Sequence, residues 1–305
     1  MTDGPRSYTS PTQGLRATVG EAVQLFRGGQ AARAHLPGDI AKQIALATLA
    51  RSAYQKATGT PLSGKKAVEI GAGQTLLLAR ALGTDNDVVA TDLDVFVEGF
   101  DLGAYRTMLR QNGAKRTLKT IGRKVLGVDS NSLKELRRQL GVARLPKAVG
   151  RQMDATKLDF PDGSIDLVYS FNVFEHLPDP TSVWRDAKRV LRTGGVLLTH
   201  LHLYTSDSGC HDLRIIRGEH DQIGHWPHLR PSEQRKVQNS AYLNKFSLAE
   251  WRRLLDAELP GGTIEHIRDD EHRGELERLR AEGELGAFSD EDLLIRNIVS
   301  VWRKP

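Results

Sequence analysis

The strongest constraint on the fold is a short buried strand that runs directly into a glycine turn. Residues 67–70 form an apolar run, residues 71–73 read Gly-Ala-Gly, and residues 75–82 have the composition of a helix. Glycine lets the backbone approach a ligand closely, and the start of a helix offers free N–H groups. A second apolar run, residues 88–91, ends on Asp92, whose carboxylate can bind both hydroxyls of a ribose. The pattern predicts a nucleotide-like ligand where two neighbouring strands end.

Strands and helices alternate along most of the chain, which predicts an α/β protein with a parallel sheet and helices on both of its faces. Predicted strands cover residues 66–70, 87–91, 149–154, 165–170, 196–202, 263–267 and 294–302. Predicted helices cover residues 39–56, 75–82, 180–191, 247–259 and 270–283, with a helix stop at 192–195. Residues 1–36 have the composition of loosely structured chain.

Composition narrows the class of protein. The chain has 305 residues with 39% apolar content, enough for a globular core. Its single cysteine, Cys210, excludes an internal disulfide. The polar start lacks the apolar block of a secretory signal, and no apolar run is long enough to span a membrane. We therefore expect a cytoplasmic protein without a membrane span.

Positive charge is concentrated in one segment. Residues 105–151 contain 13 Lys/Arg but only two acidic residues, so the segment carries +11 while the whole chain carries +5. The segment could receive an anionic acceptor, bind nucleic acid through its phosphates, or form a solvated helical face. Tyr105 is its only aromatic residue, which argues against stacking on single-stranded nucleic acid and makes that partner the less favoured one.

Six segments in matching order resemble the class I S-adenosylmethionine-dependent methyltransferases, over about residues 61–204. The resemblance implies a seven-stranded, doubly wound, mostly parallel Rossmann-like sheet whose last strand is antiparallel. It divides the chain into an N-terminal helical cap, residues 1–60, and a methyltransferase domain, residues 61–305. Within that domain we expect a basic helical insertion at 95–150 and an active-site loop or lid at 205–237. The six segments are residues 68–73, 91–94, 153–155, 160–168, 174–177 and 190–195.

The resemblance also implies the cofactor, S-adenosylmethionine, and the residues that bind it. In this family the glycine turn lies against the methionine part, the acid after the second strand binds the ribose, and the acid after the third strand meets the adenine. Leu76 stands where a dinucleotide fingerprint needs its third glycine, which argues against a nicotinamide or flavin cofactor. The implied cofactor-binding residues are Glu69 beneath the turn, Gly71, Ala72, Gly73, Thr75, Asp92, Leu93, Asp154, Ala155, Phe171 and Asn172.

Histidines crowd the predicted active-site edge: six of the ten fall within residues 200–228. We select His176, His202 and His211 as candidate catalytic bases, because a hydroxyl acceptor must lose its proton to a base. His176 could instead close a structural turn, and the histidine-rich segment could be a solvated polar loop. Asp207, Asp212 and Asp221 leave a divalent cation such as magnesium open. No ligand spacing is matched, so no residue is assigned as a metal ligand.

These features predict an S-adenosylmethionine-dependent methyltransferase that methylates oxygen on a small or medium hydroxylated acceptor. A sugar, a glycan precursor or a polyketide-like compound, anionic or not, fits this description. Alternatives are an N- or C-methyltransferase, and an inactive cofactor-binding module that acts on nucleic acid or protein through the basic insertion. Trp226, in a polar stretch, is a candidate for stacking on a sugar or covering the cofactor. The acceptor and the oligomeric state stay open.

Overall fold

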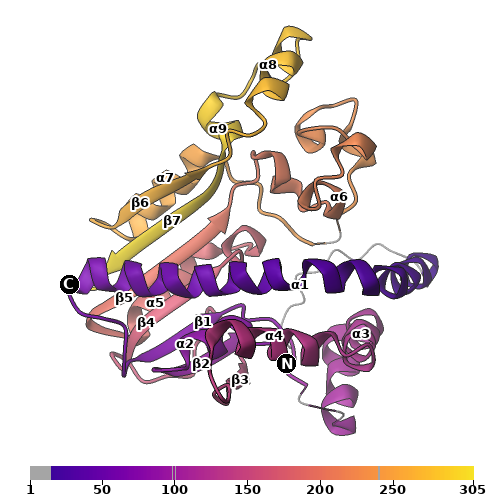
Figure 1. The fold of residues 1–305 in the computed structure, drawn as a ribbon. Helices are drawn as coiled ribbons and strands as arrows, with labels where there is room; N and C mark the ends of the chain where they lie inside the picture. Colours follow the sequence, from indigo (N-terminus) through magenta and orange to yellow (C-terminus); the bar gives the residue numbers. More distant parts are fainter. Residues whose placement is uncertain (1–14, 98, 100, 240) are drawn as a thin grey trace.

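A seven-stranded sheet forms the centre of the protein in the computed structural model, which describes residues 15–97, 99, 101–239 and 241–305 (Figure 1). The strand order is β3-β2-β1-β4-β5-β7-β6. Strands β1 to β5 are mutually parallel, β7 is antiparallel to β5, and β6 is antiparallel to β7. The predicted α/β fold with an antiparallel last strand is therefore confirmed. The strands are β1 (Lys66–Ile70), β2 (Asp87–Asp92), β3 (Val149–Gln152), β4 (Ile165–Phe171), β5 (Leu191–His202), β6 (Thr263–Arg268) and β7 (Ile295–Arg303).

Helices cover both faces of this sheet. One face packs against α1 (Leu15–Thr58), α2 (Leu77–Leu82) and α4 (Val128–Leu140), and the other against α5 (Pro180–Val190) and α7 (Leu248–Glu258). Side chains of β1 alternate between the two layers, because successive residues of a strand point to opposite faces. Val68 and Ile70 belong to the α5–α7 core, while Ala67 belongs to the α1–α2 core.

Helix α1 is longer than the sequence pattern predicted. We expected a helix at residues 39–56, but α1 begins at Leu15 and crosses one face of the sheet (Figure 1). Residues 15–36 are rich in Ala, Leu, Arg and Gln, whose high helix propensity outweighs the glycines that suggested irregular chain. Ile40, Ala47 and Tyr54 are buried in the same core as α2. The division at residue 60 stays a prediction, and residues 1–14 lie outside the described part of the chain.

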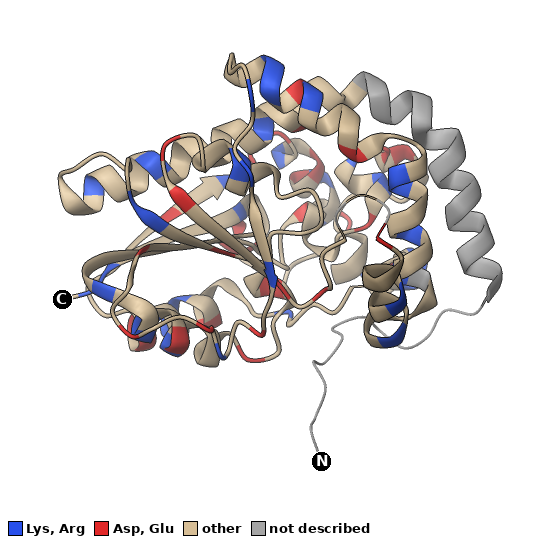
Figure 2. Cartoon of the chain, turned by 90° about the horizontal axis from the view of Figure 1, so that it is seen from below, with Lys and Arg blue, Asp and Glu red and all other residues tan. Residues whose placement is uncertain are grey.

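The basic insertion is helical, as predicted. It contains α3 (Leu102–Val125), which is kinked at Gly113, and α4. Several of its cations are paired: Arg116 with Asp94, Arg123 with Asp129 and Arg138 with Glu135. Figure 2 shows the charged residues of the chain seen from below. This local pairing reduces the field that the segment presents to a partner.

The segment after β5 is not structureless. It is a series of single-turn helices, because Gly, Pro and Asp residues between them interrupt the formation of longer helices. They are η2 (Asp207–Cys210), α6 (Leu213–Ile216), η3 (His220–Gln222), η4 (Pro227–Leu229) and η5 (Gln234–Lys236). Trp226 is 1% exposed and packs with Leu276 and Leu279 of α8 (Arg273–Ala281). The expectation that Trp226 stacks on a sugar or covers the cofactor is therefore wrong, because its ring fills a small core of its own.

Two element boundaries also differ from the predictions. Residues 192–195, predicted as a helix stop, belong to β5, which begins at Leu191 and is irregular there, with Gly194 at φ 76°. Thr75 lies in the turn, and α2 begins only at Leu77.

In the described ranges we find no helix that combines the length and the apolar character needed to cross a bilayer.

Candidate active site

The candidate site lies at the carboxyl ends of β1, β2 and β4. Strand β1 pairs with β2 on one side and with β4 on the other, and α2 and α5 leave toward opposite faces of the sheet. Such a switch in winding direction opens a crevice at the strand ends, where ligands of doubly wound sheets bind. The turn after β1 and the acid that ends β2 meet at this crevice.

The glycine turn is fastened to β2. The backbone N–H groups of Gly71 and Ala72 donate to Thr91 O at 2.8 and 3.1 Å. Gly73 N–H donates to Asp92 Oδ2 at 2.9 Å. A side chain at Gly71 would collide with Val173, since a Cβ there lies 2.3 Å from its Cγ2, whereas a Cβ at Gly73 meets nothing within 4 Å. Gly71 is thus required by packing, while Gly73 borders open space.

Glu69 lies on β1, two residues before the glycine turn, and its role toward the cofactor stays a prediction. It is 6% exposed, and Tyr169 Oη donates to its Oε2 at 3.2 Å. Burial raises its pKa to about 8, opposed by hydrogen bonds from Tyr169 and from the N–H of Ala79. An N–H group at the start of α2 therefore points to Glu69. The sequence had led us to expect that the N–H groups there would be free to bind a ligand. Leu76, which precedes α2, adopts the left-handed conformation at φ 52°.

Substitutions at the two glycines should separate stability from ligand binding. Gly71→Ala should lower the free energy of unfolding by about 2–5 kcal/mol, because the new methyl group overpacks against Val173 and the position also has a positive φ. Gly73→Ala should lower the free energy of unfolding by only about 1–2 kcal/mol, the cost of a positive φ for alanine. It should nevertheless weaken binding of S-adenosylhomocysteine, because the methyl group enters the open space. Urea unfolding and titration calorimetry on both variants measure the two effects. Equal affinity of Gly73→Ala and wild type would place the ligand elsewhere.

Asp92 and Asp94 have different surroundings. Asp92 is half-buried and accepts hydrogen bonds from Gly73 N–H and, at 3.0 Å, from Asp94 N–H. Burial raises the pKa of Asp92, against those two hydrogen bonds. The carboxylate of Asp94 accepts a hydrogen bond from Asn112 Nδ2 at 2.9 Å and forms an ion pair with Arg116. Both partners belong to α3, so this carboxylate already has its partners within the protein. Asp92 has unused lone pairs at the crevice, which fits a role toward ribose hydroxyls.

The other residues implied for the cofactor follow the same strand ends. Met153 N–H donates to Asp92 O at 2.9 Å, which brings the segment after β3 beside the end of β2. Asp154 is exposed and accepts from the N–H and the hydroxyl of Thr156, both at 2.8 Å. Asn172 has φ 55°, and its N–H donates to His200 O at 2.8 Å. Leu93, Ala155 and Phe171 adjoin these residues in the chain, and the binding roles of the whole set stay predictions.

The three candidate histidines lie together, beside Glu175. His211 Nε2 is 3.2 Å from His202 Nδ1 and 3.9 Å from Glu175 Oε1. His202 Nε2 lies 3.0 Å from Ser208 Oγ. The rings of His176 and His211 are 4.9 Å apart, and His176 Nδ1 lies 2.8 Å from Tyr242 O. Residues from η1 (Phe174–His176), β5 and η2 therefore form one cluster at the ends of β4 and β5.

Burial shifts the pKa values of the residues in this cluster. It lowers the pKa of His211 to about 4, helped by the neighbouring His176, and lowers that of His202 well below its ordinary value. Burial raises the pKa of Glu175 to about 8, and neither of its carboxyl oxygens has a hydrogen-bond partner among the described residues. At neutral pH the imidazoles are thus uncharged and can accept a proton. Glu175, His202 and His211 are also close enough to hold a metal ion.

Glu175 was not selected as a candidate from the sequence. It precedes His176 in the segment Phe-Glu-His-Leu, where a carboxylate beside a histidine is the only local signal. Nothing local shows that this carboxylate is 2% exposed and faces His211, which follows much later in the chain.

His200 should make the fold sensitive to acid. It is 5% exposed, and burial lowers its pKa to about 4. Between about pH 6.5 and pH 4 the unfolded chain binds a proton that the folded state does not, so stability falls as the pH is lowered through this window. The loss attributable to His200 at pH 4 is up to about 3 kcal/mol. His200→Gln should reduce the difference in unfolding free energy between pH 7.5 and 4.5, measured with urea. His35→Gln, on the exposed surface, is the control, and equal pH dependence of all three proteins would contradict the prediction.

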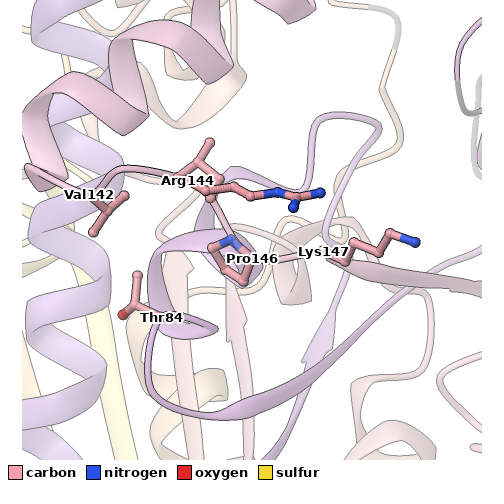
Figure 3. A pocket seen from close by; sticks show the side chains of 6 residues that line it. Thr84, Val142, Arg144, Pro146 and Lys147 are labelled. Carbon is pink, nitrogen blue, oxygen red and sulfur yellow. The ribbon is translucent and has the colours of Figure 1, made fainter.

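Surface pockets also lie at the opposite end of the strands. Figure 3 shows one of about 460 Å³, lined by Thr84, Val142, Arg144, Leu145, Pro146 and Lys147. These residues precede β2 and β3 in the chain, so they lie at the amino ends of those strands. The hollow is therefore separate from the glycine turn and the histidine cluster.

Comparison with known proteins finds a methyltransferase domain in part of this chain. Residues 111–199 match the family model described as a methyltransferase domain. Uncharacterized methyltransferases of Mycobacterium sp. are similar over a short stretch: strain JLS at 36% identity over 61 residues, 20% of this chain and 24% of the relative. The protein of strain KMS is 38% identical over 58 residues, 19% of this chain and 23% of the relative. The match thus spans about a quarter of these curated relatives.

Solved structures with a similar fold include an S-adenosylmethionine-dependent methyltransferase from Mesorhizobium loti, at 14% identity and TM-score 0.43, covering 83% of this chain and 96% of that one. Another is phosphoethanolamine N-methyltransferase 2 of Haemonchus contortus in complex with S-adenosylmethionine, at 15% identity and TM-score 0.42, covering 84% of this chain and 52% of that one.

The strand order and the antiparallel β7 define a Rossmann-like sheet. The match over residues 111–199 adds a methyltransferase domain, in agreement with the resemblance of the sequence to the class I S-adenosylmethionine-dependent methyltransferases.

Proposed function

We propose that this protein transfers a methyl group from S-adenosylmethionine to a hydroxyl oxygen of a small or medium acceptor. One observation carries the proposal: uncharged His202 and His211, with Glu175, lie at the same sheet edge as the glycine turn and Asp92. A hydroxyl is a weak nucleophile until it gives up its proton, whereas an amine nitrogen that is already unprotonated attacks without a base. A site rich in neutral imidazole therefore favours oxygen.

The residues that would hold the cofactor fit it. Gly73 borders open space, and Asp92 keeps unused lone pairs beside that space. Asp154, exposed after β3, and Phe171 with Asn172, after β4, would complete the binding site. When bound, S-adenosylmethionine supplies a methyl group activated by a sulfonium. The protein's task is then to orient the acceptor, exclude water and accept one proton.

We assign the base to His211 and the positioning role to His202. When His211 Nε2–H donates to His202 Nδ1, the other nitrogen of His202 carries the proton that faces Ser208 Oγ, and His211 Nδ1 is left as an acceptor. The hydroxyl proton passes to that nitrogen, so an O–H bond breaks and an N–H bond forms. Glu175, 3.9 Å from His211, stabilises the resulting imidazolium when it is ionised. His176 contacts the outer side of the His211 ring.

The acceptor class follows from the same site. A hydroxylated compound such as a sugar, a glycan precursor or a polyketide-like molecule satisfies the need for a base. The net positive charge of residues 105–151 would favour an acidic member of that group.

The test uses S-adenosylmethionine with a carbon-13 methyl group and fractionated cell extract. We expect the label to appear in a methyl ether, identified by mass spectrometry and NMR. Label on nitrogen or carbon would overturn the assignment to oxygen. Binding of S-adenosylhomocysteine without transfer to any fraction, together with salt-sensitive binding of generic RNA or DNA, would instead support the inactive module.

A further inference from the structure

A second histidine cluster lies outside the candidate catalytic residues. Its centre is Asp207 Oδ2, which is 2.7 Å from His220 Nε2, 3.2 Å from His225 Nδ1 and 3.8 Å from His272 Nε2. One donor atom from each of the four side chains lies within 4.8 Å of all the others. These four residues, here called the Asp207 cluster, come from η2, η3, the segment before η4 and the residue before α8.

Hydrogen bonding alone does not account for this convergence. His220 and His225 hydrogen-bond Asp207 Oδ2 and use both lone pairs of that oxygen, whereas His272 Nε2, 3.8 Å away, makes no hydrogen bond to it. The rings of His220 and His225 are stacked, 3.9 Å between centroids and 12° between planes. Two protonated rings in that arrangement would repel each other. A single cation between neutral imidazoles and the carboxylate satisfies all four groups at once.

The distances suit a small tetrahedral ion. Zinc binds imidazole nitrogen and carboxylate oxygen at about 2.0–2.2 Å. Ligand atoms at the corners of such a tetrahedron lie about 3.3 Å apart, near the middle of the observed range of 2.7–3.8 Å from Asp207 Oδ2. Three imidazoles also disfavour magnesium, which prefers oxygen ligands. Asp212, considered earlier as a magnesium ligand, is instead bonded to Arg214 and to Gln238 N–H.

The carboxylate of the cluster is held in place independently of the histidines. Asp207 is 5% exposed, and its Oδ1 accepts the backbone N–H of Trp226 at 2.6 Å. Trp226 adopts the left-handed conformation at φ 45°, which turns this N–H toward Asp207. Hydrogen bonds of this kind orient the ligands of protein metal sites.

The surrounding fold has little else to stabilise it. The stretch from η2 to η5 consists of single turns, and among the described residues two small cores support it: six buried side chains around Trp226, and three from Cys210, Ile215 and Ile223. Cores of this size rarely hold a structure by themselves, and small metal-bound units commonly compensate for it. A shared ion would join three short turns of the segment after β5 to the start of α8.

We propose that Asp207, His220, His225 and His272 bind one zinc-type ion that fixes this part of the fold. The ion is structural, because all four positions are filled by protein and no site is left for a substrate. The ion would also help to position His202 in the neighbouring cluster. Asp207 and Ser208 both belong to η2, and Ser208 Oγ contacts His202. The inference does not depend on the proposed methylation of oxygen.

The experiment measures metal in the full-length protein after dialysis into metal-free buffer. We expect about one zinc per chain, a lower Tm after removal by chelator, and recovery of Tm with added zinc. Cobalt added to the stripped protein should give the intense visible absorption of tetrahedral coordination. His272→Gln and His220→Gln should weaken zinc binding by more than about 100-fold, since even changes beyond the ligands cost ten- to a hundredfold.

Two controls keep the outcome clear. His35→Gln changes an exposed residue of α1 that belongs to neither cluster and should retain the metal, whereas His211→Gln tests the cluster formed by Glu175, His202 and His211. Far-UV circular dichroism and binding of S-adenosylhomocysteine show whether each variant is folded. The proposal is overturned if zinc neither binds nor raises Tm, which would leave an ion-paired cluster. It is equally overturned if a folded His272→Gln and His220→Gln keep the metal, or if only His211→Gln loses it.

Discussion

Replacing His211 with alanine should lower turnover by roughly 10²- to 10⁴-fold, the usual contribution of a general base. The affinity for S-adenosylhomocysteine should stay unchanged, because His211 directly follows η2 and does not belong to the glycine turn. Methyl transfer to the acceptor found with carbon-13 label gives the rate, and calorimetry gives the affinity. His202→Ala should have a smaller effect, because His202 orients His211. Full turnover in both variants would place the base elsewhere.

The pH profile adds a readout that loss of structure does not mimic. Burial raises the pKa of Glu175 to about 8, so its carboxyl is mostly protonated at neutral pH. As the pH rises through that value, the carboxylate forms and stabilises a protonated His211. The kcat/KM of wild type should therefore rise through about pH 8, and Glu175→Gln should remove this rise while keeping the side chain's shape. An unchanged rise in Glu175→Gln would separate Glu175 from the proton transfer.

The central strands and the glycine turn could be predicted because their signals are local. An apolar run such as residues 67–70, followed by Gly71 and Gly73, specifies both a strand and its end. Asp92 follows from the same reasoning on the next strand. The start of α1 could not be predicted as well, because Gly and Pro signals compete there with residues of high helix propensity.

Contacts between distant segments explain what the sequence did not reveal. His272 belongs to the Asp207 cluster but is separated in the chain from His220 and His225 by the whole of β6 and α7. No spacing rule joins such residues, and the histidine-rich segment therefore showed no metal pattern. The polar setting of Trp226 was similarly misleading, because the apolar partners of its ring come from α8 and α9 (Asp290–Leu294).

Replacing Asp92 with alanine should weaken binding of S-adenosylhomocysteine by about 1–3 kcal/mol, since charged hydrogen bonds to the ribose are lost. That corresponds to roughly ten- to a hundredfold in Kd. Part of the effect comes from the turn, because Asp92 Oδ2 also accepts Gly73 N–H. Asp92→Asn keeps the shape of the side chain but removes its charge, so it should retain more of the fold and still bind more weakly.

Asp94→Asn is the matched control for this prediction. It lies two residues away and is also half-buried, but its carboxylate is occupied by Asn112 and Arg116. We expect it to loosen α3 and leave the ribose contact intact, so calorimetry should show nearly wild-type affinity. If Asp94→Asn weakened binding as much as Asp92→Ala, the position of α3 and not the carboxylate at the end of β2 would control affinity. Unchanged affinity in both Asp92 variants would exclude the ribose assignment, and with it the strongest link between the crevice and an adenosyl cofactor.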